Sequence, residues 1–273
     1  MTVEVAYHEI CEKLKNAEIP DYSFEAKWII KHFSGENFLS KRLLTEVEEI
    51  LINGAKNRRI QGEPLQYIIG EWEFYSLPFY TSSGVLIPRT DTETLVDAAL
   101  YGLQDITMPK ILDLCTGSGC VAVTLAKHMP NAKVIAADLY DKPLLLCQKN
   151  IERNSLKNCE ILKLDVLKQP EIPLDFDLIT CNPPYIKSSD MNDLQREVLF
   201  EPKTALDGGE DGLLFYKSLC ENFAPKMKEG AMLAVEIGYD ISEEVSTLFE
   251  KEFKKIKKYK DINKQIRVIT GIK

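Results

Sequence analysis

The stretch Asn182-Pro183-Pro184-Tyr185 combines residue types that could hold an amino group for chemistry. It follows the apolar run 178–181, which is typical of a buried strand. The prolines fix φ and lack an N–H, so the bend offers acceptors, namely the Asn182 side-chain oxygen and the Pro183 carbonyl. Tyr185 adds an aromatic face and a hydroxyl. Two fixed acceptors suit a planar –NH2 group, an amide or an exocyclic base amine, although Asn-Pro is also a common turn dipeptide. We predict that all four residues are catalytic and bind substrate.

A glycine-rich turn lies upstream, in the stretch "DLCTGSGC" at 113–120. It follows an apolar strand pattern and precedes a helical one, and its glycines allow a tight turn and a close approach to a ligand. We therefore predict a cofactor site at this turn. The candidate residues here are Asp113, Cys115, Thr116, Gly117, Ser118 and Gly119.

The ligand of this turn is ambiguous from the glycines alone, because the spacing up to Ala122 also satisfies the dinucleotide fingerprint of a nicotinamide dehydrogenase. A purely structural turn is a further alternative. Three acids favour S-adenosylmethionine over a dinucleotide. We place Asp113 within the turn, where its carboxylate can approach a cationic end of the ligand. We place Asp138 at the end of the second strand, where it can accept from the ribose hydroxyls. Asp165, with Val166 beside it, ends the third strand and could accept from the adenine amine. Asn182 lies close enough to join this cofactor site.

The elements around these residues alternate between strand and helix from residue 110 onward. Apolar runs predict strands, and periodic segments between them predict helices, with the strands at 110–115, 132–139, 159–166, 176–182, 231–238 and 264–272 and the helices at 119–129, 142–154, 212–227 and 241–253. This order predicts a mainly parallel, doubly wound sheet, whose strands point their carboxyl ends at a ligand crevice. The lysine-rich stretch 250–260 is a solvated helix face or an edge strand, or a local basic patch.

The part before residue 90 has a different character. Residues 1–70 show helical periodicity, with a stop at Gly35 and a capping-box pattern at Thr45 and Glu48, and predict a helical bundle. Residues 71–89 alternate aromatic and β-branched types around a turn and predict a hairpin linker. Residues 90–273 then form the α/β domain.

Composition limits the functional class. The net charge of −8 speaks against a protein devoted to nucleic acid, and no apolar run is long enough to span a membrane. The seven cysteines are irregularly spaced, without a CxxC pair, so we expect neither a metal site nor disulfides. The N-terminus lacks the pattern of a secretory signal, and we expect a cytoplasmic protein.

The tetrapeptide resembles the motif of methyltransferases that act on planar nitrogens, which include adenine methyltransferases of DNA and RNA. Further stretches are similar to one branch, the glutamine methyltransferases of peptide-chain release factors (HemK/PrmC-type): "RRIQGEPLQYIIGEWEFYSLPF", "VLIPRTDTE", "EPKTALDGGEDGL", "VEIGYD" and "IRVITG". The sequence departs from that family at Thr90, where proline is usual, at Ser76, where glycine is usual, and before the final strand, where Gly-Arg is missing.

The resemblance implies a Rossmann-like class I methyltransferase sheet with a helical recognition domain. It implies transfer of a methyl group from S-adenosylmethionine to the glutamine of a Gly-Gly-Gln loop in a release factor, with no direct binding of nucleic acid. No histidine lies near the motifs, so we expect catalysis by positioning rather than by a general base. The alternatives are an adenine methyltransferase and a non-catalytic module. We assign no role to Arg89, Asp91, Glu93 or the loop 201–213, each of which could serve the site or merely cap a helix or connect elements.

Overall fold

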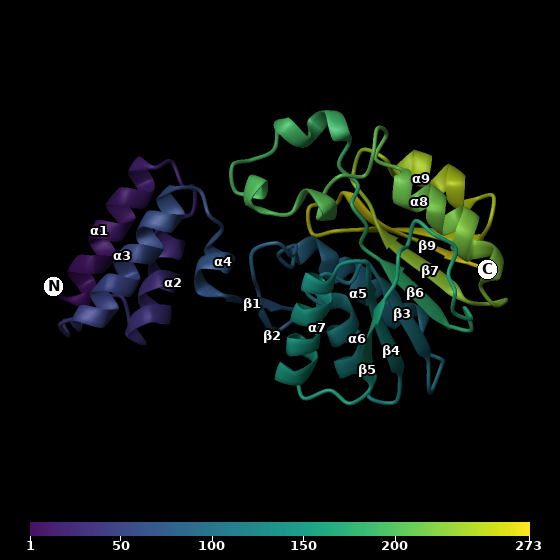
Figure 1. Cartoon of the computed structure of the whole chain (residues 1–273), viewed down its shortest axis with the longest axis horizontal. Coiled ribbons are helices and arrows are strands. Elements are labelled where there is room, and N and C mark those ends of the chain that lie inside the picture. The colour runs from purple at the N-terminus through teal and green to yellow at the C-terminus, as the bar shows by residue number, and fades with distance from the viewer. The chain divides into compact units, whose positions relative to one another are not determined.

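A computed structural model describes residues 1–273 of the chain (Figure 1). The chain divides into two compact units. The first comprises Met1–Glu71 with Gln195–Phe200, and the second comprises Trp72–Leu194 with Glu201–Lys273. None of the helices has the length and apolar composition that crossing a bilayer requires.

The first unit is helical, as the sequence predicts. Its helices are α1 (Val3–Asn16), α2 (Tyr22–Ser34), α3 (Glu46–Ile60) and the short α4 (Leu65–Ile69), which we did not predict. Gly35 ends α2 in the left-handed conformation at φ 71°, and Thr45 with Glu48 forms the predicted capping box at the start of α3. These local signals determine where two of the helices begin or end.

A two-stranded hairpin follows, with β1 (Glu71–Phe74) and β2 (Leu77–Tyr80). Its two turn residues, Tyr75 and Ser76, have φ of 51° and 58°. A two-residue hairpin turn with positive φ at both positions favours Asn or Gly. Ser76 therefore occupies a conformation that glycine adopts with less strain, which gives a physical meaning to this departure from the family pattern.

The second unit is built on a seven-stranded sheet in the order β5-β4-β3-β6-β7-β9-β8. The strands are β3 (Lys110–Leu114), β4 (Lys133–Asp138), β5 (Cys159–Lys163), β6 (Leu178–Cys181), β7 (Met232–Glu236), β8 (Lys254–Lys260) and β9 (Ile266–Ile272). The first five strands in this order pair in parallel, whereas β9 pairs antiparallel with both β7 and β8. The strand order reverses between β3 and β6, and a ligand crevice is expected at such a point.

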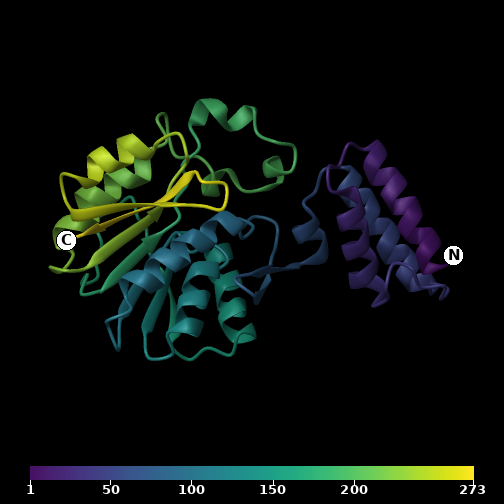
Figure 2. The same cartoon turned by 180° about the vertical axis from the view of Figure 1, so that it is seen from behind.

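Helices cover both faces of this sheet. Figures 1 and 2 show α5, α6 and α7 on one side and α8 and α9 on the other. Their bounds are α5 (Glu93–Gly102), α6 (Cys120–His128), α7 (Asp141–Arg153), α8 (Leu214–Ser218) and α9 (Ser242–Phe249). Alternate residues of one strand enter different cores: Ile111 of β3 packs with α5 to α7, while Leu112 packs with α8 and α9. The predicted class of fold is confirmed.

Several boundaries differ from prediction. The segment 212–227 is not one α-helix: α8 ends at Ser218, a π turn follows, and a 3₁₀ turn then contains Pro225, whose missing N–H cannot continue an α-helix. Helix α9 stops at Phe249, and most of the lysine-rich stretch forms the edge strand β8. Exposed lysines on an edge strand discourage pairing with another chain.

Candidate active site

A cavity of about 290 Å³ opens at the carboxyl ends of β3, β4 and β6, beside the point where the strand order reverses. Most of the predicted cofactor residues line it, including Asp113, Cys115, Thr116, Gly117, Ser118, Asp138, Asp165, Val166 and Asn182, together with Pro184 from the tetrapeptide. Gly119, Pro183 and Tyr185 are not among its lining residues. The doubly wound sheet therefore gathers residues from four separate stretches around one hollow.

The glycine turn has the tight geometry that its sequence indicates. Cys115, Gly117 and Gly119 all have positive φ, at 55°, 56° and 82°. A Cβ at Gly119 would lie 2.5 Å from the Cys147 sulfur, so glycine is needed there for packing against α7. A Cβ at Gly117 would meet no atom closer than 4.0 Å, and this residue lines the cavity. The two glycines thus do different work: one lets α7 approach, and the other leaves room for a ligand.

We expected Asp113 in the turn, but it lies inside β3. Its carboxylate is buried and accepts from the hydroxyls of Thr116, at 2.6 Å, and Thr180, at 2.7 Å. Burial raises the pKa of Asp113 to about 6, although the two hydroxyls lower it. The side chain is therefore held rigidly at the floor of the cavity, and it ties the turn to β6.

The other two acids lie at the end of strand β4 and just beyond the end of strand β5. Asp138 ends β4 and accepts from the backbone N–H of Gly117 at 3.0 Å and of Tyr140 at 3.1 Å. Burial raises its pKa, against these two amide donors. Asp165 lies two residues beyond the end of β5, where it accepts from the Leu167 N–H at 3.0 Å. Each carboxylate keeps lone pairs for a ligand, because one amide donor per oxygen does not saturate it.

Asn182 lies directly after β6, half-buried at the edge of the cavity. Its Nδ2 donates to the Thr92 hydroxyl at 3.2 Å, which leaves Oδ1 to accept from elsewhere. The Tyr185 hydroxyl points at Glu236 of β7, 3.5 Å from Oε1. The tetrapeptide is therefore held from two sides, by Thr92 and by β7.

The loop 201–213 packs directly on the tetrapeptide. A Cβ at Gly208 would lie 2.7 Å from the Tyr185 Cα, and one at Gly212 would lie 2.7 Å from the Tyr185 carbonyl oxygen. The backbone of Ile186 also bonds to Leu206 at 2.9 Å and to Gly208 at 2.7 Å. The glycines of this loop are thus explained by close packing against the tetrapeptide.

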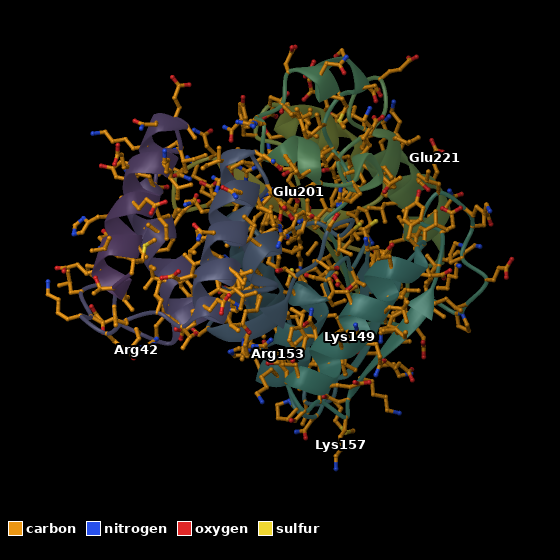
Figure 3. The ribbon with its side chains drawn as sticks, turned by 60° about the vertical axis from the view of Figure 1, so that its left-hand side comes forward. Arg42, Lys149, Arg153, Lys157, Glu201 and Glu221 are labelled. Carbon is orange, nitrogen blue, oxygen red and sulfur yellow. The ribbon has the colours of Figure 1, made fainter.

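Sequence reasoning missed the importance of Glu201. Its side chain, 1% exposed, accepts from the Ile87 N–H at 3.0 Å and forms an ion pair with Arg89. Figure 3 shows Glu201 among other side chains, whereas Glu221 lies at the outline. Because Ile87 and Arg89 both line the cavity, this carboxylate anchors one of its walls. The only signal in the sequence was an acid followed by proline at 201–202, and it did not indicate which residues Glu201 would contact.

A doubly wound sheet with a glycine turn, acids after two successive strands and an Asn-Pro-Pro-Tyr bend defines a class I methyltransferase that uses S-adenosylmethionine. The lining fits this cofactor, because carboxylates suit its cationic and hydroxyl groups and Gly117 leaves open space. Two family models agree. "Methyltransferase small domain" matches residues 91–218, and "PrmC N-terminal domain" matches residues 6–70.

Curated relatives identify the family. The release factor glutamine methyltransferase of Koribacter versatilis is 35% identical over 100% of this chain and 99% of its own length. That of Fusobacterium nucleatum is 32% identical over 89% of this chain and 71% of its own length. That of Geobacter sulfurreducens is 41% identical over 72% of this chain and 69% of its own length. The chain belongs to the release factor glutamine methyltransferase family.

Solved structures support the fold. The hMettl16 catalytic domain, in complex with an RNA hairpin, has a TM-score of 0.59 at 14% identity, over 86% of this chain and 85% of that one. The 16S rRNA methyltransferase RsmC of T. thermophilus, in complex with AdoMet and guanosine, has a TM-score of 0.53 at 20% identity, over 74% of this chain and 49% of that one. Such low identities show a shared architecture and nothing about substrate.

Proposed function

We propose that this protein transfers a methyl group from S-adenosylmethionine to the side-chain amide nitrogen of the glutamine in the Gly-Gly-Gln loop of a peptide-chain release factor. The observation that carries the proposal is the Asn182 amide, whose Nδ2 is engaged by Thr92 so that Oδ1 is left as an acceptor at the cavity edge. The names of the relatives supply the release factor.

In this proposal the residues of the site act by positioning. Asn182 Oδ1 and the Pro183 carbonyl would accept from the two N–H groups of the substrate amide, which would orient its nitrogen toward the bound cofactor. The cofactor supplies a methyl group activated by its sulfonium. Transfer of that methyl group would form a nitrogen–carbon bond at the expense of its bond to sulfur, and the amide nitrogen would release one proton to solvent. The two acceptors also favour the positive charge that develops on nitrogen.

The remaining predicted residues have supporting roles in the proposal. Asp138 binds the ribose hydroxyls, Asp165 with Val166 binds the adenine end, and the turn at 115–119 surrounds the amino-acid end, with Asp113 beneath it. Pro184 and Tyr185 keep the bend rigid. The location of most of these residues around one cavity supports the assignment.

The test is incubation with radiolabelled S-adenosylmethionine and a release factor, beside the same factor with its loop glutamine changed to alanine. Label on the unaltered factor alone is the expected result. Label on adenine-containing RNA or DNA instead would replace the amide by a base amine and favour the adenine methyltransferase. A net charge of −8 makes direct binding of nucleic acid unfavourable.

The role of Asn182 has its own test. Asn182→Ala removes one of the two acceptors, and we expect kcat to fall by roughly 10²–10³. The Kd for S-adenosylmethionine should change far less. A variant with wild-type kcat would contradict the positioning role.

We further propose that residues 1–70 recognise the release factor and that residues 90–273 carry out the methyl transfer. Residues 71–89 would connect these two parts of the chain. Support comes from apolar side chains on the helical unit that are exposed to solvent: Leu43 is 68%, Val47 65% and Ile50 64% exposed. Val47 and Ile50 lie three residues apart on α3 and so share one face of that helix, and exposed apolar groups on one face favour a protein partner. Val47→Asp with Ile50→Lys should raise KM for the release factor and leave the Kd for the cofactor unchanged. A substrate that acts in translation would also place this enzyme in the cytoplasm.

A further inference from the structure

A buried carboxylate lies behind the tetrapeptide, and the reaction as described so far does not use it. Glu236 is the last residue of β7 and is 2% exposed. Its Oε2 is the one buried side-chain atom that has no hydrogen-bond partner. Buried polar groups nearly always have partners, and an unpartnered carboxylate oxygen destabilises the fold. Such a group calls for a functional reason.

The surroundings of Glu236 come from several elements. The Tyr185 hydroxyl lies 3.5 Å from Oε1, and the Thr92 hydroxyl, at the start of α5, acts on the carboxylate and lowers its pKa. Arg267 of β9 also lowers that pKa, whereas Asp91 raises it. Arg267 is itself engaged by two other acids, Asp91 at 3.1 Å and Asp261 at 3.2 Å. The buried Tyr216 hydroxyl donates to the Glu236 backbone carbonyl at 2.8 Å. The charge of the Glu236 carboxylate also contributes to raising the pKa of Cys120 in α6.

Thr92 interacts with both groups, because its hydroxyl lowers the pKa of Glu236 and contacts the Asn182 amide. Its hydroxyl oxygen accepts from Asn182 Nδ2 at 3.2 Å. A hydroxyl has a single proton, so a Thr92 that donates to an ionised Glu236 must present lone pairs to Asn182. Asn182 then has to offer its NH2 to Thr92 and its oxygen to the cavity.

We propose that Glu236 and Thr92 are positioning residues that determine which way the Asn182 amide faces. In this arrangement the Thr92 proton turns to the unpartnered Oε2 of an ionised Glu236, the Thr92 oxygen accepts from Asn182, and Asn182 Oδ1 is left to accept from the substrate. If Glu236 can donate, the Thr92 proton can turn to Asn182 Oδ1, and the amide flips so that it presents a donor where the substrate needs an acceptor. The inference rests on the proposed function, because it acts only through Asn182.

Protonation of Glu236 should therefore interrupt the chain of hydrogen bonds from Glu236 through Thr92 to Asn182, which we call the relay. Burial raises the pKa of Glu236 to about 7, so the ionised fraction grows through neutral pH. We expect kcat at saturating cofactor to rise with pH through this range. Asp113 titrates lower, at about 6, and touches the turn rather than Asn182. Its titration should appear in cofactor affinity rather than in kcat.

The experiment compares the full-length protein with Glu236→Gln and Thr92→Val, by methyl transfer to a release factor from pH 5.5 to 9. We expect kcat at pH 8 to fall by about 100-fold in each variant, as misplacement of a reacting group does. The Kd for S-adenosylmethionine, measured by calorimetry, should stay within about twofold of wild type, because Glu236 does not line the cavity and Thr92→Val keeps the volume of the side chain that does. Glu236→Gln should also lose the rise of kcat with pH.

Double variants distinguish loss of the relay from general damage to the fold. In the Asn182→Ala background, Glu236→Gln should cause no further loss, and the double variant of Thr92 and Glu236 should be no worse than either single one. Thr92→Ser keeps the hydroxyl and should retain most of kcat. Thr124→Val is the matched control: this buried threonine only donates to the Cys120 carbonyl at 2.6 Å, and the variant should match wild type.

The outcomes distinguish the two proposals. Wild-type kcat and pH profile in both Glu236→Gln and Thr92→Val, beside an inactive Asn182→Ala, would overturn the relay and leave the positioning role of Asn182 intact. Full activity of Asn182→Ala would overturn that role itself. If Glu236→Gln fails to fold, Thr92→Val with its coupling to Asn182 decides the question alone.

Discussion

Two buried charged side chains, one in each unit, are treated in opposite ways. Arg59 of α3 is 1% exposed, and Glu236 of β7 is 2% exposed. The guanidinium of Arg59 is paired with Glu25, 2.9 Å from Nη2 to Oε1, and with Glu197. Glu236 has one carboxylate oxygen with no partner. The helical unit pairs its buried charge, whereas the α/β unit leaves one oxygen of its buried carboxylate without a partner.

The difference teaches how each charge serves the protein. Burial would lower the pKa of Arg59, but the carboxylates of Glu25 and Glu197 outweigh it and raise that pKa. Arg59 therefore keeps its charge, although burial raises the pKa of Glu25 despite the nearby guanidinium, and the pair connects α2, α3 and the segment 195–200 within one unit. Glu236 lacks comparable compensation, and it can change its charge near neutral pH. A fully paired charge stabilises the fold, whereas a charge with too few partners can change its protonation state with pH.

Breaking the Arg59 pair should have the largest effect on folding. Arg59→Met leaves the largely buried Glu25 carboxylate without its main partner, and we expect the free energy of unfolding of the helical unit to fall by about 3–5 kcal/mol. Urea unfolding followed by circular dichroism measures this. Arg58→Met is the matched control, because Arg58 is 47% exposed and its pair with Glu63 should contribute less than about 1 kcal/mol. Equal losses in the two variants would remove the contrast.

Neutralising Glu236 should stabilise rather than destabilise at high pH. Its pKa is about 7 in the folded protein, against an ordinary value of 4.5. Between these values the folded state holds a proton that the unfolded state has lost, so stability falls as pH rises, by about 3 kcal/mol in total. Glu236→Gln should lose this part of the decline.

Urea unfolding of both proteins at pH 5 and pH 8 measures the difference. Asp113 contributes a similar slope at lower pH, but it is present in both proteins and cancels. A variant whose free energy of unfolding declines between pH 5 and pH 8 as steeply as wild type would mean that Glu236 is compensated after all.

A change at Glu201 should be smaller and should act on the cofactor. Glu201→Gln keeps an acceptor for the Ile87 N–H but loses the ion pair with Arg89. Because both partners line the cavity, we expect the Kd for S-adenosylmethionine to rise roughly tenfold, which corresponds to about 1.4 kcal/mol. Calorimetry measures it, with Glu210→Gln on the exposed part of the same loop as the control. An unchanged Kd would make Glu201 purely structural.

The smallest effect is expected at a helix cap. Thr45→Ala removes the side chain that accepts from the Glu48 N–H at 3.3 Å, and we expect a loss of about 1 kcal/mol in the helical unit. Thr45→Ser retains the hydroxyl and should stay close to wild type in the same urea titration. A loss as large as that of Arg59→Met would mean that local capping, not the buried pair, dominates this unit.

Much of this protein could be predicted from local patterns. The alternation of strands and helices, the cap at Thr45, the stop at Gly35 and the turn around Gly117 all follow from short-range physics, in which neighbouring residues decide φ, ψ and hydrogen bonding. The predictions that failed concern ends of elements. Asp113 belongs to β3 rather than to the turn, and the segment after Ser218 leaves the α-helical geometry.

The sequence by itself determined the chemistry on offer: a rigid bend of acceptors after one strand and a glycine turn with acids after others. It could not name Thr92, Glu201 or Glu236 as neighbours of that chemistry. Asn182 lies 90 positions from Thr92, and Ile87 lies 114 from Glu201. Only the order of strands in the folded sheet brings such segments together, because burial in a shared core, and not local propensity, decides which distant side chains meet.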